Sequence, residues 1–157
     1  KLVPSLSKNL VIVSGLARGI DTLAHWQCLR SGGKTVAVLG GSLDKIYPRE
    51  NQLLAQEIIG NGGALISEKP LNSTLVPADF PLRNRIIAGL SLGTLVIEGG
   101  QKSGTKITAG MAADYGREVF CVPGPIDSDL SVGPAELIQQ GAKLVTKVED
   151  IFSELRF

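Results

Sequence analysis

Short apolar runs recur along the chain, and each one predicts a β-strand. The runs are continuous rather than alternating, which is typical of strands whose two faces are both buried under helices. Segments between them carry apolar residues at helical spacing, as at Leu53, Leu54 and Ile58. The pattern therefore predicts an α/β, three-layer fold with a mostly parallel sheet. The predicted strands cover residues 10–13, 35–39, 64–66, 94–97, 118–122 and 143–145.

Two kinds of connection alternate between these elements. The joints from helix to strand are short and contain glycine, which can end a helix in the left-handed conformation. The joints from strand to helix are longer and more polar, and they lie at the carboxyl ends of the strands. Helix N-termini and loop amides converge at that edge of an open parallel sheet, so we expect a ligand site there. The longer joints cover residues 14–21, 40–50, 67–85, 98–105 and 123–134.

The length and composition favour one compact globular domain. Of the 157 residues, 20% are charged and 43% are hydrophobic, a balance that excludes a disordered tail or a highly charged nucleic-acid arm. The net charge of +1 provides almost no long-range field, so an anionic partner must be held by Lys and Arg gathered locally. We expect one domain over residues 1–157, with residues 1–8 as the remnant of a preceding helix.

Cysteine spacing and hydropathy favour a cytoplasmic protein. Cys28 and Cys121 have neither the paired spacing of a zinc site nor the density of a secreted disulfide scaffold, so we expect buried free thiols. No apolar run approaches the roughly 18 residues of a membrane span, and residues 1–15 lack the organisation of a signal peptide. We therefore expect a cytoplasmic location and no membrane partner.

The loop at residues 98–105 has the composition of a phosphate cradle. Glycine at positions 99, 100 and 104 leaves the backbone open, Lys102 adds a positive charge, and Ser103 and Thr105 can cap a helix that begins near Lys106. The spacing is not that of a Walker loop, because the Lys-Ser pair precedes the third glycine. A purely structural turn is the alternative interpretation.

The loop at residues 14–21 places a cation at the start of a helix. Gly15 and Gly19 flank Arg18, which can face an anion, while Asp21 in the first turn offsets the helix dipole. His25 lies four residues after Asp21, at a spacing that favours a contact anchoring the helix over a catalytic pair. There is no GxSxG motif, and neither cysteine has an identifiable neighbouring base, so we expect no catalytic residues.

The segment at residues 77–85 combines an aromatic ring with cations. Phe80 is followed by Arg83, Asn84 and Arg85, just before a predicted helix, and Tyr47 stands between two basic residues in another loop of the same edge. Rings that stack on unpaired bases and cations that neutralise phosphates are the means by which proteins hold single-stranded nucleic acid. The alternative is that both rings anchor their loops while the arginines pair with acids. The candidate acids are Glu68, Asp79 and Glu98.

Five segments together resemble the signatures of the DNA-processing protein A (DprA/Smf) family, and they occur in the family's order. The resemblance spans residues 13–151 and implies an extended Rossmann-like domain that binds single-stranded DNA. It further implies protection of incoming DNA, help in loading the RecA recombinase during natural transformation, a homodimer, and no turnover of nucleotide. We expect neither a cofactor nor a metal. The segments read SGLARGID, LDKIYPREN, FPLRNRIIAGLSLG, KSGT-x-IT and REVFCVPGPID.

The resemblance also assigns the site by position. Phe80 is similar to the family's base-stacking aromatic, and residues 83–85 match its Arg-Asn-Arg signature. Pro77 stands where a basic residue is common, and the family's Gly-Ser/Thr-Arg turn is missing, so we expect its first strand to be absent from this chain. The nucleic-acid-binding residues implied are Ser14, Gly15, Arg18, Phe80, Arg83, Asn84, Arg85, Lys102, Ser103 and Gly104.

Two enzyme-like interpretations compete with this one. The loop at residues 98–105 is also similar to the phosphate motif of nucleotide phosphoribohydrolases, but no glutamate follows the Gly104-Thr105 step to act on a ribosyl bond. A dinucleotide-binding sensor would require a GxGxxG motif at a helix start, with an acidic residue about 20 positions later. No such motif occurs, so we expect a binding protein and not an enzyme.

Overall fold

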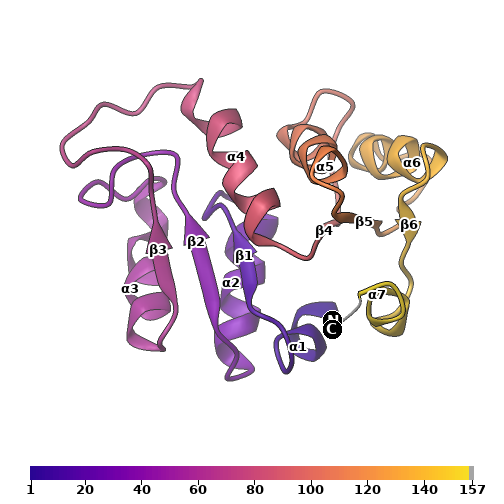
Figure 1. The fold of residues 1–157 in the computed structure, drawn as a ribbon, viewed down its shortest axis with the longest axis horizontal. Coiled ribbons are helices and arrows are strands. Elements are labelled where there is room, and N and C mark those ends of the chain that lie inside the picture. Colours follow the sequence, from indigo (N-terminus) through magenta and orange to yellow (C-terminus); the bar gives the residue numbers. More distant parts are fainter. Residues whose placement is uncertain (156–157) are drawn as a thin grey trace. The chain divides into compact units, whose positions relative to one another are not determined.

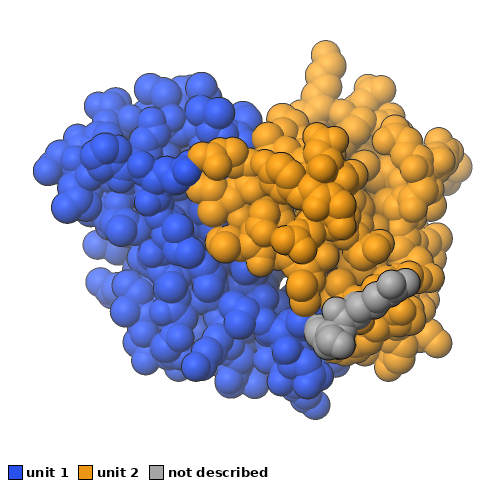
Figure 2. All heavy atoms as spheres, in the orientation of Figure 1, with its two compact units in different colours: residues 1–83 blue, residues 84–157 orange. Residues whose placement is uncertain are grey.

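The computed structural model describes residues 1–155, which fall into two compact units. Unit 1 comprises residues 1–83 and unit 2 continues from residue 84 (Figure 2). The boundary lies inside one helix, between Arg83 and Asn84. Each unit contains a three-stranded parallel sheet, so the α/β class is confirmed and the strands divide between two sheets.

Unit 1 is built on a sheet with the strand order β1-β2-β3 (Figure 1). Helix α2 packs against β1 and β2, and α3 packs against β2 and β3. A buried apolar cluster lies between these layers and includes Leu16, Leu54 and Ile58. The elements are α1 (Leu2–Leu6), β1 (Ile12–Ser14), α2 (Ile20–Arg30), β2 (Thr35–Val38), the 3-10 helix η1 (Arg49–Asn51), α3 (Gln52–Gly60), β3 (Ala64–Ile66) and the first turn of α4 (Asp79–Leu90).

Unit 2 has the strand order β4-β5-β6, also parallel. Helix α5 packs against β4 and β5, and α6 packs against β5. Val96, Ala109, Cys121 and Leu137 form its buried cluster. The elements are β4 (Gly93–Val96), α5 (Gly104–Asp114), β5 (Glu118–Cys121), the 3-10 helix η2 (Asp129–Ser131), α6 (Val132–Gln139), β6 (Lys143–Leu144) and α7 (Glu149–Phe152).

The predicted strands all occur, but one helix begins earlier than predicted. Helix α4 starts at Asp79, so Phe80 and the Arg-Asn-Arg signature lie on the helix and not in a loop before it. Pro81 does not prevent this, because it sits in the first turn, where backbone N–H groups have no helical partner. Both cysteines are buried free thiols, as predicted.

His25 is fully buried inside unit 1 as a neutral imidazole. Its Nδ1 lies 2.7 Å from Oγ1 of Thr35, which in turn donates to the carbonyl oxygen of Ile12 at 2.6 Å. The Thr35 hydroxyl therefore accepts from Nδ1–H, which leaves the buried Nε2 without a hydrogen-bond partner. Burial lowers the pKa of His25 to about 4, although the nearby Asp21 opposes this shift.

This depressed pKa predicts acid sensitivity of unit 1. An unfolded histidine titrates near 6.5, so between that pH and about 4 the unfolded chain binds the proton and the folded unit does not. We expect the free energy of unfolding to be highest, with respect to this group, above pH 6.5. It should fall by about 3 kcal/mol as the pH drops to about 4. Urea titrations followed by the fluorescence of Trp26, the only tryptophan, measure it.

The matched control is His25→Asn, which keeps a donor for Thr35 but does not titrate. Its stability should stay nearly flat over the same pH range. The carboxyl groups of Asp44, Glu50 and Asp79 have pKa values lowered by hydrogen bonds, so their contributions are lost only at still lower pH. Equal losses in wild type and variant would contradict the assignment to His25.

Candidate functional site

The loop at residues 14–21 is held in place by side chains of α2, of η1 and of the loop itself. Asp21 at the start of α2 accepts from the backbone N–H groups of Gly15 and Ala17, at 3.0 and 3.1 Å. The Asn51 amide donates to the carbonyl oxygen of Leu16 at 2.8 Å. Leu16 itself has a φ of 58°, and its fully buried side chain anchors the loop in the interior of unit 1. Arg18 is thereby carried on a fixed loop with its side chain in solvent.

Arg83 supports the same loop from inside unit 1. It is 7% exposed, and its Nη1 donates to the carbonyl oxygens of Gly15, at 2.6 Å, and Val38. A Cβ atom at Gly15 would lie 2.6 Å from this guanidinium, so a larger residue at position 15 would displace the Arg83 side chain from its hydrogen bonds. Burial lowers the pKa of Arg83, and Asp21 opposes that shift. The structure thus gives Arg83 a structural role, and its contact with nucleic acid stays a prediction.

Four side chains form an aromatic–arginine cluster at the carboxyl ends of the unit 1 strands: Arg18, Tyr47, Glu50 and Phe80. The ring centroids of Tyr47 and Phe80 are 5.8 Å apart, with the planes tilted by 48°. Arg18 lies over the Tyr47 ring at 5.8 Å from its centroid, and its Nε donates to the Glu50 carboxylate. Phe80 is half-buried and Tyr47 is 46% exposed, so neither ring is enclosed in the interior.

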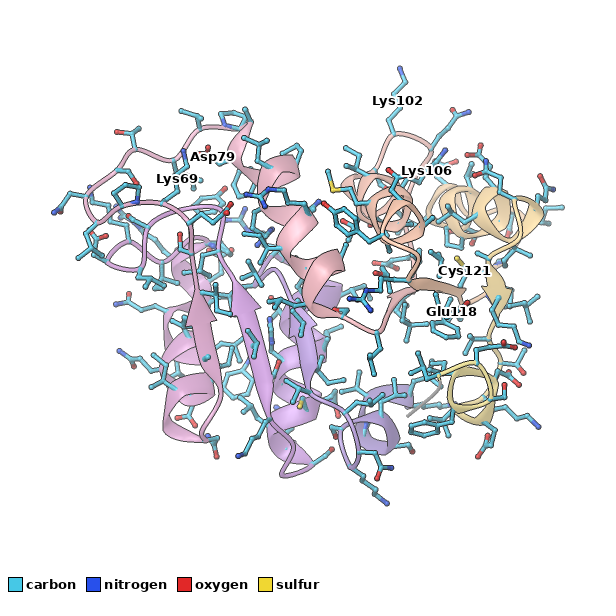
Figure 3. The ribbon with its side chains drawn as sticks, in the orientation of Figure 1. Lys69, Asp79, Lys102, Lys106, Glu118 and Cys121 are labelled. Carbon is cyan, nitrogen blue, oxygen red and sulfur yellow. The ribbon has the colours of Figure 1, made fainter. Side chains whose placement is uncertain are left out.

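The first turn of α4 positions Phe80 for this cluster. Lys69 Nζ lies 2.6 Å from the buried Asp79 carboxylate, as the close approach of the two labelled residues in Figure 3 shows. The same carboxylate accepts from the Val76 N–H at 2.9 Å, and both bonds lower the pKa of Asp79. A Cβ atom at Gly40 would lie 3.2 Å from Phe80 Cδ1, so the ring rests directly against the backbone after β2.

In unit 2 the glycine-containing loop at residues 98–105 leads into α5. Gly99 is pinned between neighbouring segments, since its N–H donates to Leu130 and its carbonyl oxygen accepts from Gly133, both at 2.8 Å. Ser103 occupies the N-cap position of α5, but its hydroxyl makes no capping bond. Lys102 is exposed and projects away from the loop (Figure 3). The Asn84 amide reaches the carbonyl oxygen of Gly104 at 3.5 Å.

The predicted site residues therefore form two groups, one in each unit. Ser14, Gly15, Arg18, Phe80 and Arg83 belong to unit 1, and Arg18 and Phe80 both flank Tyr47. The other group, in unit 2, consists of Asn84, Arg85, Lys102, Ser103 and Gly104. Arg85 is exposed on α4.

Sequence reasoning missed Glu50 as the partner of Arg18, and it did not identify Lys69 as the partner of Asp79. Glu50 lies 32 residues from Arg18, so local sequence spacing could not predict that the two side chains pair. Asp79 pairs with Lys69 rather than with an arginine, and its position in the first turn of α4 was the available signal.

The titratable side chains singled out from the sequence, Asp21, His25 and the two cysteines, each have a defined environment. The Asp21 carboxylate is bonded to loop amides and His25 is bonded to Thr35, so these two residues anchor structure separately. Burial raises the pKa of both thiols, that of Cys121 to about 11, which keeps them protonated at neutral pH. Among residues 1–155, no group of three His, Cys, Asp or Glu side chains could hold a metal ion, and no helix is long and apolar enough to cross a membrane.

Comparison with known proteins gives a consistent result over the whole chain. Residues 1–156 match the family described as DNA recombination-mediator protein A. The chain is 49% identical to protein Smf of Escherichia coli over 151 residues, 96% of this chain and 40% of that protein. It is 48% identical to DNA processing protein DprA of Streptococcus pneumoniae over 157 residues, 100% of this chain and 55% of that protein. The chain thus spans about half the length of these relatives.

Two solved structures resemble this one closely. The X-ray structure of DNA processing protein A from Streptococcus pneumoniae matches with a TM-score of 0.93 at 47% identity, covering 100% of this chain and 55% of that one. DNA processing protein A from Helicobacter pylori matches with a TM-score of 0.86 at 32% identity, covering 98% and 70%. The Helicobacter structure is described for its single-stranded DNA binding mode.

The buried guanidinium predicts a stability effect at Arg83. Lysine keeps the charge but lacks the planar fork of donors, so Arg83→Lys should leave a buried carbonyl poorly satisfied. We expect the free energy of unfolding of unit 1 to fall by about 1–3 kcal/mol, measured by urea titration with Trp26 fluorescence. The control Arg49→Lys, at an exposed arginine of the same unit, should change it by less than about 0.5 kcal/mol. Equal midpoints for the two variants would contradict the structural role of Arg83.

Proposed function

This chain belongs to the DNA recombination-mediator protein A (DprA/Smf) family, and we propose that it binds single-stranded DNA at the carboxyl ends of its strands. The observation that carries the proposal is the aromatic–arginine cluster, in which Tyr47 contacts both the half-buried Phe80 and the exposed Arg18. Unpaired bases stack on such rings at about 1–3 kcal/mol each, whatever their identity. The cluster therefore suits a strand whose bases are exposed and whose sequence varies.

Cations on loops that follow strands, one in each unit, supply the second part of the binding chemistry. Arg18 in unit 1 and Lys102 in unit 2 are both exposed on loops that follow strands. Each can neutralise a phosphate, and the net charge of +1 means that such local contacts must provide the electrostatic attraction. Ser103 and Gly104 at the start of α5 would add a hydroxyl and a backbone N–H to a phosphate near Lys102.

The relatives support a wider role for the intact protein. The family is described as a recombination mediator, and the Helicobacter relative is described as binding single-stranded DNA. We therefore propose that the full protein protects incoming DNA and helps to load RecA during natural transformation, as a cytoplasmic homodimer. We further propose that it acts by binding and not by catalysis, because Asp21 and His25 are committed to structural contacts.

Removing the Phe80 ring tests the stacking component. Phe80→Ala should raise the Kd for fluorescent oligo-dT about 5- to 150-fold, because a base loses its stacking partner. Fluorescence anisotropy measures this, with a duplex of the same length as a weaker-binding comparison. Tyr115→Ala is the matched control, since Tyr115 is 49% exposed but ends α5 at the opposite edge of unit 2. An unchanged Kd for Phe80→Ala would remove the basis of the proposal, and release of free base from nucleoside monophosphates would favour an enzyme instead.

Removing the charge at Lys102 tests the phosphate component. Lys102→Ala should weaken oligo-dT binding a few-fold at low salt and flatten the slope of log K against log salt by about 0.7. The control is Arg117→Ala, an exposed cation just before β5, at the amino end of that strand. Titrations at several salt concentrations give both slopes. If the two variants share one slope, Lys102 has no special relation to phosphate.

A further inference from the structure

Glu50 has a position unlike that of the other carboxylates that organise unit 1. Asp21 and Asp79 accept from backbone N–H groups and hold their loops in place. Glu50 instead bonds the Arg18 side chain and its own backbone, with the two side chains 64% and 54% exposed for Arg18 and Glu50. The neighbouring Asn51 already ties η1 to the loop at residues 14–21. Glu50 is therefore not required to hold the loop.

We propose, on the basis of the function proposed above, that Glu50 competes with DNA phosphate for Arg18 and so lowers the affinity of this chain for single-stranded DNA. A carboxylate and a phosphate are alternative acceptors for the same guanidinium donors. The exposed pair contributes at most about the equivalent of a five-fold change in an equilibrium constant, so an arriving phosphate can displace the carboxylate. Glu50 thus acts as an internal competitor within the aromatic–arginine cluster.

The position of Tyr47 connects this competition to the proposed binding of DNA. Arg18 lies over the Tyr47 ring, and Tyr47 contacts Phe80, so a phosphate on Arg18 would lie beside the ring that adjoins the proposed stacking residue. The guanidinium can stay over Tyr47 while it exchanges one acceptor for the other. Only the Glu50 side chain needs to move, and it is already in solvent.

A double-mutant cycle tests the proposal. The proteins are wild type, Glu50→Gln, Arg18→Ala and the double variant, with Glu57→Gln as a control that removes an exposed carboxylate from α3 of the same unit. The readout is the Kd for fluorescent oligo-dT over a range of salt. Glu50→Gln should bind about two- to five-fold more tightly than wild type at low salt, with a slope of log K against log salt steeper by about 0.7. In the Arg18→Ala background, the same substitution should have no more effect than Glu57→Gln.

The outcomes separate this proposal from the function on which it rests. Equal affinities of wild type and Glu50→Gln, or an equal gain in the Arg18→Ala background, would overturn the competition while leaving single-stranded DNA binding intact. If neither wild type nor Glu50→Gln binds oligo-dT while Trp26 fluorescence reports a folded unit 1, both proposals fail. Unchanged urea midpoints of all variants confirm that the differences concern binding.

Discussion

The carbonyl oxygens of Gly15 and Val38 share one buried donor, the guanidinium of Arg83, and the site in unit 1 depends on this arrangement. The two carbonyls belong to the chain segments that leave β1 and β2. A charged group in this interior is costly to bury, and its hydrogen bonds and the nearby Asp21 offset that cost. Because Arg83 and Phe80 share the first turns of α4, the contact that fixes the two strand ends also fixes the ring.

Buried and exposed charged residues have different roles in this structure, and the difference follows from this constraint. Arg83, Asp21 and Asp79 are committed to backbone groups and position the loops. Arg18 and Lys102 remain in solvent, where they can meet a ligand without a large desolvation cost. An arginine in a family signature can therefore support a binding surface from inside the protein instead of contacting the ligand. Here the buried Arg83 supports the surface, and the exposed Arg18 lies over the Tyr47 ring.

Much of the fold could be predicted from the apolar pattern. All six strands occur within two residues of their predicted limits, and the first begins at Ile12 because Leu10 is still bonded to Leu6 in the turn after α1. The start of α4 was misplaced because Pro77 and Pro81 are typical of a loop, whereas a proline in the first helical turn breaks no bond. The division into two sheets was not predicted, since periodicity identifies strands but not their partners.

The site could be predicted only as a list of residues. Loop composition singled out Arg18, Phe80 and the glycine-containing loop as candidates, but the pairing of Arg18 with Glu50 and of Arg83 with Gly15 joins positions 32 and 68 residues apart. Tertiary structure alone decides such pairings.

The most direct test of the account is the footprint of single-stranded DNA on the backbone amides of this chain, measured by NMR chemical-shift changes on addition of oligo-dT. The account predicts that the largest changes occur in the loops at residues 14–21, 40–50 and 98–105, which follow strands, and in residues 77–85 at the start of α4. Changes concentrated at the glycine turns that precede the strands, such as Gly32, Gly62 and Gly116, would contradict it.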